Sequence, residues 1–444
     1  MASGTRTRPG AGAPARDSAA PAPGPEAPPS AAAARPATPG AVHLRTHRGR
    51  TGAFRLQRLV LVESAAAALL VGWAVGPVAL VPAGAVAVAL VLLAFVRRRG
   101  RSLPEWLATV RALRARQRLA ASTPVPEGTE PSLAPAVECE PRLRTCSWGG
   151  RDRRPVGMVG DGTFLSAVVQ VEADVTALRA ERGRRPLPVG PVRDALEVDG
   201  IRLESAQIVL HTQPAPALHL PQHSVAVTNY APLQELTGAP AVRITWIALK
   251  LDPELCQEAV AARGGGLVGA QRCLARVADH LASRLTGAGF RTTVLDEEEL
   301  TAALATSACA NPLVTAEAGR TGARERRTEE SGRSWRCDNR RHTTYWIRRW
   351  PQLGGRGPSL PQLVARLTAV PALATTFSLT LFRGERQETV LCGHVRVTGR
   401  GDDELVAARR AVQDAAREMG VGLTRLDREQ VPGVLATLPL GGAR

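Results

Sequence analysis

Three features of this chain have residue types and spacing that could do chemistry. They are the histidines of a Pro-rich stretch, two glycine-rich segments, and one segment rich in arginines and aromatic residues. His211, His219 and His223 include the His-x3-His spacing that metal sites use. A metal site would also need a third ligand and an ordered geometry, and neither is evident. We therefore interpret the three histidines as residues of a loop.

The motifs of the common enzyme classes are absent. The sequence contains no GxxxxGK[ST], HExxH, GxSxG or Asp-x-Asp pattern. Gly157, Gly160 and Gly162 lack dinucleotide-fingerprint spacing and are better explained by a hairpin turn. The glycines at 264–266 could offer backbone N–H groups to a phosphate, but a connection between two helices is the favoured interpretation. No catalytic residue, metal ligand or cofactor is predicted, and we expect a protein that is not an enzyme.

The segment "RSWRCDNRRHTTYWIRRW" gathers arginines and aromatic residues more densely than any other part of the chain. Aromatic stacking beside phosphate-binding arginines is how single-stranded nucleic acid is held. Alternation along the strand fits two other interpretations equally well, a hairpin facing protein or lipid and a core strand with one solvated face. The residues with which we expect it to contact a partner are Tyr345, Trp346, Arg348 and Trp350.

Composition weakens the nucleic-acid interpretation. The net charge is +17, which alone would suggest an anionic partner. Lys250 is the only lysine, however, so nearly all the basic residues are arginine, as a GC-rich genome imposes on any protein. The seven cysteines are scattered without CxxC spacing, which suits buried thiols in a reducing compartment.

The elements that position these residues begin with a long apolar run from Leu59 to Val96, in which Glu63 is the only charged residue. A single helix over this run would be about 57 Å long at ~1.5 Å per residue, whereas the hydrocarbon core of a bilayer is ~30 Å thick. A break at Gly76-Pro77 leaves two segments, ending at Val75 and starting at Val78, that are each about one bilayer deep. The run predicts a transmembrane hairpin with both ends in the cytosol.

Arginines at both ends of the run support this topology, since positive charge favours the cytoplasmic side. They are Arg55 and Arg58 before it, and Arg97, Arg98, Arg99 and Arg101 after it. Glu63 is expected to reach the cytosolic interface or to pair within the membrane. The connection at Gly76-Pro77 is uncharged and too short to form a domain outside the cell. The chain is therefore predicted to be a multi-pass protein of the plasma membrane with a cytoplasmic domain.

The rest of the chain divides into three parts. Residues 1–53 are rich in Pro and Ala and predict a disordered tail, and residues 54–100 form the hairpin. Residues 101–136 predict a basic amphipathic helix and a linker, with Trp106 placed either at the lipid interface or against a partner. Residues 137–444 alternate helical and strand patterns and predict one α+β (mixed α/β) domain with a mixed sheet; no repeat is visible.

The order of these segments resembles a known family. The hairpin is followed by "VGMVGDGTFLSAVVQV", "LEVDGIRLESAQIVLHTQP", "RCLARVADHLASRLTGAGFRTTVLDEEEL" and "TTYWIRRWP". Together they look like EccE, the E component of the actinobacterial type VII (ESX) secretion membrane complex. The resemblance runs from about Phe54 to Val431.

This resemblance implies a non-catalytic subunit that assembles with the B, C and D components, of which C is the ATPase, into a hetero-oligomer in contact with membrane lipid. It also implies a degenerate glycosyltransferase-like fold for the cytosolic domain. On this basis we expect a subunit that braces other core subunits in protein export, without nucleic acid. The alternatives are a membrane-bound glycosyl- or nucleotidyl-type transferase and a membrane-tethered nucleic-acid-binding protein.

Overall fold

The computed structural model describes residues 51–95, 97–98, 101–149, 154–173, 186–213, 225, 242–322, 325–354, 357–384 and 388–442; it does not describe the side chains of 51–58 and 93–105. Most of the predicted tail, His219, His223, Val96 and Arg99 therefore lie outside the described residues, as do the side chains of Arg55, Arg58, Arg97, Arg98 and Arg101.

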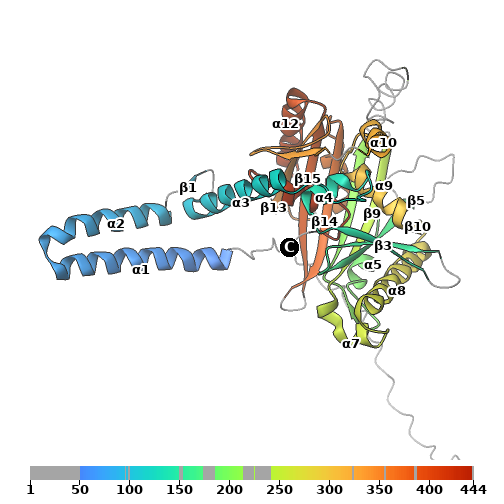
Figure 1. Cartoon of the computed structure of the whole chain (residues 1–444), viewed down its shortest axis with the longest axis horizontal. Helices are drawn as coiled ribbons and strands as arrows, with labels where there is room; N and C mark the ends of the chain where they lie inside the picture. Colours follow the sequence, from blue (N-terminus) through green and yellow to red (C-terminus); the bar gives the residue numbers. More distant parts are fainter. Residues whose placement is uncertain are drawn as a thin grey trace, which may run out of the picture. The chain divides into compact units, whose positions relative to one another are not determined.

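The apolar run forms two helices that lie side by side, α1 (Thr51–Val75) and α2 (Pro77–Phe95) (Figure 1). Gly76 separates them with a positive φ of 129°, so the predicted break is where the chain turns. The two helices approach closely at Gly72, where an added Cβ would lie 2.4 Å from the Cβ of Ala83. In the described residues, no helix is both long enough and apolar enough to span a bilayer.

Two short strands and a helix follow the hairpin, namely β1 (Arg97–Arg98), β2 (Arg101–Ser102) and α3 (Leu103–Ser122). The helix α4 (Ala134–Cys139) comes next and is mostly buried. The amphipathic helix predicted for this region is thus confirmed as a helix, α3.

A twelve-stranded sheet organises the rest of the described chain. Its main path runs in the order β11-β12-β13-β15-β14-β8-β9-β5-β4-β3, with β10 beside β5 and β16 beside β13. The strands of the first part are β3 (Arg144–Trp148), β4 (Val156–Gly160), β5 (Leu165–Ala173), β8 (Ser205–Gln213), β9 (Val242–Leu251) and β10 (Phe290–Val294). Those of the second part are β11 (Thr328–Glu330), β12 (Trp335–Cys337), β13 (Arg340–Arg349), β14 (Ala374–Arg383), β15 (Thr389–Gly399) and β16 (Gly422–Arg425).

Helices cover both faces of this sheet. The larger apolar core lies under α5 (Val189–Asp194), α8 (Gly266–Gly287), α11 (Leu360–Thr368) and α12 (Asp402–Glu418). The second core, on the opposite face, contains residues of α4, α9 (Glu297–Ser307) and α13 (Gln430–Leu435). The remaining elements are the small hairpin β6 (Glu197–Val198) and β7 (Ile201–Arg202), the 3-10 helix η1 (Pro253–Cys256), α7 (Gln257–Ala261) and α10 (Pro312–Thr321).

The predicted α+β class is confirmed, but the prediction of a mixed sheet was wrong. Every pairing between described strands is antiparallel. Helix and strand signals alternate in the sequence because helices connect pairs of hairpins, and such a connection can return the chain antiparallel as well as parallel. Two predictions from local signals are confirmed. Asp161-Gly162 lies in the turn between β4 and β5, and Asp296 with Glu299 forms the capping box of α9.

The sheet consists of two equivalent halves that meet where β8 pairs with β14. Val209 lies opposite Ser378 at this junction, and the register repeats outward on both sides. In the first half, Ile247 of β9 lies opposite both Ile208 and Val169, and Val294 of β10 lies opposite Val169 on its other side. In the second half, Val395 of β15 lies opposite both Phe377 and Tyr345, and Arg425 of β16 lies opposite Tyr345 on its other side. The order of elements is also the same, so the structure contains an internal repeat that the sequence did not reveal.

The ends of the two halves show the repeat most directly. After β10 the chain reads "LDEEELTAALAT" (295–306), and after β16 it reads "LDREQVPGVLAT" (426–437). The N–H of Leu295 bonds to the carbonyl of Val168, and that of Leu426 bonds to the carbonyl of the equivalent residue, Thr344, both at 3.0 Å.

The two halves are interlocked by the segments that follow α9 and α13. The segment after α9, which belongs to the first half, contacts the second half, since Arg340 donates to the carbonyls of Cys309 and Ala310. The segment after α13, which belongs to the second half, contacts the first half in the same way, because Ser166 of β5 donates to the carbonyl of Leu440 at 2.7 Å. Each half therefore completes the core of the other.

Candidate functional site

The histidine and glycine positions singled out in the sequence have structural roles where they are described. His211 is a buried residue of β8 and not of a loop, and its Nδ1 lies 2.9 Å from Thr376 Oγ1, which corrects our interpretation of that residue. The glycines 264–266 all have positive φ and connect α7 to α8, as predicted. Across the described residues, no three His, Cys, Asp or Glu side chains are grouped so that they could hold a metal ion.

The densest polar network of the described chain is instead built on residues 326–330, which we call the hub segment. It consists of two arginines followed by β11, which is the edge strand of the second half. An edge strand exposes unpaired backbone groups unless another element covers it. Here the hub segment binds α3, α4, α10 and α13 through side chains.

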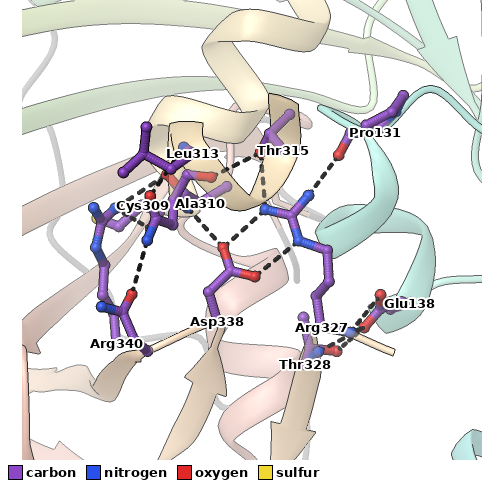
Figure 2. A network of polar contacts seen from close by, with 12 residues as sticks. Pro131, Glu138, Cys309, Ala310, Leu313, Thr315, Arg327, Thr328, Asp338 and Arg340 are labelled. Atoms are coloured by element: carbon purple, nitrogen blue, oxygen red, sulfur yellow. Dashed lines mark hydrogen bonds and ion pairs between the residues drawn. The ribbon is translucent and has the colours of Figure 1, made fainter. Parts of the chain in front are cut away.

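Arg327 is the centre of the network (Figure 2). Its guanidinium forms a bidentate ion pair with Asp338, with Nε–Oδ1 and Nη2–Oδ2 both at 2.8 Å, and the two side chains are only 7% and 2% exposed. The same guanidinium donates to the carbonyl of Pro131 and to Thr315 Oγ1, each at 2.8 Å. Asp338 also accepts from the N–H of Asn311 at 2.6 Å. A buried charge pair is stabilising only when its remaining groups are bonded, and this one meets that condition.

Glu138 of α4 is bound by the same segment. Its carboxylate accepts from the N–H groups of Arg327 and Thr328 and from the hydroxyl of Thr328, at distances from 2.7 to 3.1 Å (Figure 2). Arg326 adds a bond of 2.7 Å to the carbonyl of Glu138 and one of 3.1 Å to that of Ala120 in α3. The side chain of Glu138 is fully buried, so these bonds replace the water that it loses.

Glu330 attaches α3 to the sheet. Its carboxylate accepts two bonds from Arg116, at 2.8 and 2.9 Å, and a third from the N–H of Val431 at 3.0 Å. Gln117, also on α3, donates to the carbonyl of Glu330 at 2.9 Å. Nearby, the guanidinium of Arg428 lies 5.2 Å from the centre of the Trp106 ring, within the range of a cation–π contact.

The arrangement can hold α3 to the sheet. The hub segment holds the helix that follows the apolar hairpin to a rigid antiparallel sheet, through charge-assisted bonds that are among the stronger hydrogen bonds in proteins. A displacement of α3 would break the bidentate contact of Arg116 with Glu330, so the orientation of α3 is coupled to that of the sheet.

The hub segment lies within a part of the chain that matches a known family. Residues 239–347 match the family EccE, described as "Putative type VII ESX secretion system translocon, EccE". The resemblance noted in the sequence is therefore confirmed, and the match supports a component of a type VII secretion system. No curated protein matches the sequence.

The residues that we expected to contact partners lie in different surroundings. Tyr345 is buried in the larger core, and burial raises the pKa of its hydroxyl. Trp346 is half-buried against Phe382, Val390 and Cys392, while Arg348 is exposed. Trp350 is half-buried, with its ring against Gly393, and Trp106 is half-buried beside Arg428. Whether these residues contact a partner stays a prediction.

Sequence reasoning missed the hub segment. The run "RERRTEE" carries no known motif, and no role was predicted for it. A usable signal was present, since two arginines directly precede a short strand with two glutamates. Its partners, however, lie in other parts of the chain, and only the fold brings them together.

Removing the charge of Glu330 should loosen α3. We expect Glu330→Gln to lower the free energy of unfolding by about 1.5–3 kcal/mol, because a charge-assisted bond to Arg116 is lost, and to speed amide hydrogen exchange in residues 106–120. Urea unfolding and exchange followed by mass spectrometry would measure both effects. Glu317→Gln, which removes an exposed ion pair with Arg320, is the control and should change stability by only about 0–1 kcal/mol. Equal effects of the two variants would contradict the role of the hub.

Buried histidines should make the fold sensitive to mild acid. Burial lowers the pKa of His211 to about 3 and that of His394 to about 4, and it lowers the pKa of His342 as well. Below pH 6.5 the unfolded chain takes up protons that the folded chain does not, so stability is full above that pH and declines as pH falls toward 4. Each histidine contributes a slope of about 1.4 kcal/mol per pH unit in this window.

Unfolding measured between pH 7 and pH 5 would test this expectation. His394→Gln should give a shallower decline than the unchanged chain. An identical slope in both proteins would show that folding does not lower the pKa of His394, which would contradict the expectation.

Proposed function

We propose that this chain is a non-catalytic, membrane-anchored subunit of a type VII secretion complex, which braces neighbouring core subunits at the cytoplasmic side. The observation that carries the proposal is the hub segment, which lies within the EccE-family match and fixes α3 to the sheet. A brace must resist relative movement between its anchor and its body, and a buried, fully bonded ion-pair network provides that resistance.

The surface of α1 and α2 supports membrane anchoring. Small residues lie between the two helices, with Ala65, Gly72 and Ala87 buried there. Large apolar side chains point outward and are exposed; they include Leu70, Val71, Trp73, Val75, Val78, Val81, Val88 and Leu92. Water-soluble helical hairpins have the opposite pattern, whereas helices packed in lipid use small residues at the contact.

The proposed division of the chain follows from this anchoring. The described side chains cover only 59–75 of α1 and 77–92 of α2, while the apolar run in the sequence continues to Val96. We therefore retain the hairpin over residues 54–100, the juxtamembrane helix and linker over 101–136 and the cytoplasmic domain over 137–444 as parts of the proposal, together with two crossings of the plasma membrane.

The antiparallel sheet favours a brace over a transferase. In open α/β sheets, nucleotide sites form outside the carboxyl ends of parallel strands. The described strand pairs of this domain are all antiparallel, so they form no such edge. This argument also weighs against the glycosyltransferase-like fold that the family resemblance implies.

Reporter fusions should place the tip of the hairpin outside the cell and the C-terminal end of the chain inside. We expect a reporter inserted after Gly76 to be active only outside the cell, and one fused after Arg444 to be active only inside. The chain should also stay with the membrane fraction after a carbonate wash. A soluble chain, or reporters on opposite sides from those stated, would contradict the membrane hairpin.

Purification of the full chain from native membranes in mild detergent should recover other secretion subunits, including the B and D components and the C ATPase. The double variant Arg116→Gln with Glu330→Gln should recover them at lower yield, because the orientation of α3 relaxes, whereas Glu317→Gln should not differ from the unchanged chain. If the folded, unchanged chain recovers no secretion subunit, the proposed function is wrong.

A further inference from the structure

Arg396, near the middle of β15, is fully buried on the sheet face that α9 covers. Its Nη2 donates to the carbonyl of Ser307, at the end of α9, and lies 3.4 Å from Thr376 Oγ1. Its Nε and Nη1 have no hydrogen-bond partner among the described residues. A buried guanidinium with two unbonded nitrogens is costly, because it has lost its water without a replacement.

No negative side chain of the described residues compensates this charge. Burial lowers the pKa of Arg396, and the only side chains that act on it in the opposite direction are the thiols of Cys139, Cys309 and Cys337. Burial raises the pKa of all three thiols, so they are neutral at pH 7 and supply no counter-charge. Arg327, by comparison, has the carboxylate of Asp338 beside it.

Other unbonded donors belong to neighbouring residues on the same face. Thr344 lies opposite Arg396 in the sheet, and its buried hydroxyl has no partner among the described residues. His342 uses Nδ1 for a contact of 2.9 Å with Thr398 Oγ1 and leaves Nε2 unbonded. Trp335, whose ring centre lies 4.9 Å from that of His342, leaves its indole N–H unbonded. Each of these unbonded groups can donate a hydrogen bond, as Arg396 can.

The first half of the domain shows that the fold itself does not require these polar residues. At the same places in the sheet register, the first half has Val159 for Trp335 and Ser166 for His342. It also has Val168 for Thr344 and Ala248 for Arg396. All four equivalents are fully buried, and three of them are apolar. An apolar core is therefore compatible with this backbone, and the polar cluster of the second half calls for another explanation.

We propose that Arg396, Thr344, His342 and Trp335 form a buried binding site for a small inorganic anion, of which chloride is the probe. A positive charge with unbonded hydrogen-bond donors on the same face of neighbouring strands is an environment that suits an anion. Water could accept the bonds but would leave the charge of Arg396 uncompensated. Complete burial restricts the site to a small ion, held between the two interlocked halves where the end of α9 meets β15.

The purified full chain in detergent should bind chloride at a saturable site, measured by equilibrium dialysis with radioactive chloride. Thermal unfolding should occur at higher temperature in chloride or bromide than in gluconate at equal ionic strength. Thr344→Val should weaken chloride binding about tenfold, since it removes one donor to a charged ligand. Arg396→Met should abolish saturable binding.

Thr380→Val is the matched control, because Thr380 is also buried with an unbonded hydroxyl but lies opposite Cys392 and Gln207, away from Arg396. It should leave chloride binding unchanged. Thr344→Val keeps the test decisive if Arg396→Met fails to fold. Absence of saturable chloride binding by the unchanged chain, or equal weakening by Thr344→Val and Thr380→Val, would overturn the proposal.

Discussion

The antiparallel pairing of β8 with β14 is the constraint on which the rest of the domain depends. Val209 lies opposite Ser378 at the junction of the two halves, and the register of the strands is equivalent on both sides of that pair. The segments after α9 and α13 then cross to the opposite half, where they bond to Arg340 and Ser166. Since neither half closes its own core, the two halves should fold and unfold as one body.

The two halves share a backbone arrangement but differ in side chains. A comparison of equivalent positions therefore separates residues that the fold needs from residues that serve another role. Residues at equivalent places in α8 and α12, such as Leu274 and Leu405, are buried and apolar in both halves, because both helices cover the same core. The hub segment and the Arg396 cluster, in contrast, occur only in the second half. The second half therefore carries the contacts that attach α3, while the same places in the first half are more apolar.

Elements with local signals could be predicted from the sequence, and contacts between distant segments could not. Gly76-Pro77, the Asp161-Gly162 turn and the Asp296 capping box each involve neighbouring residues, so the sequence indicates them directly. The pairing of β8 with β14 joins strands far apart in the chain, and alternation alone does not say which strands meet. The internal repeat was hidden for a similar reason, since only short stretches such as "LD" and "LAT" recur in both halves.

Three of the arginines in the described residues are internal. Arg327, Arg340 and Arg396 are buried, and the first two use their guanidinium groups to bind carbonyls or a carboxylate of other segments. Arginine suits this role because its planar group donates in several directions at once. These three arginines are therefore not available to an anionic partner at the surface. In this domain arginine serves as a connector between segments, which agrees with a protein whose proposed work is to hold other parts in place.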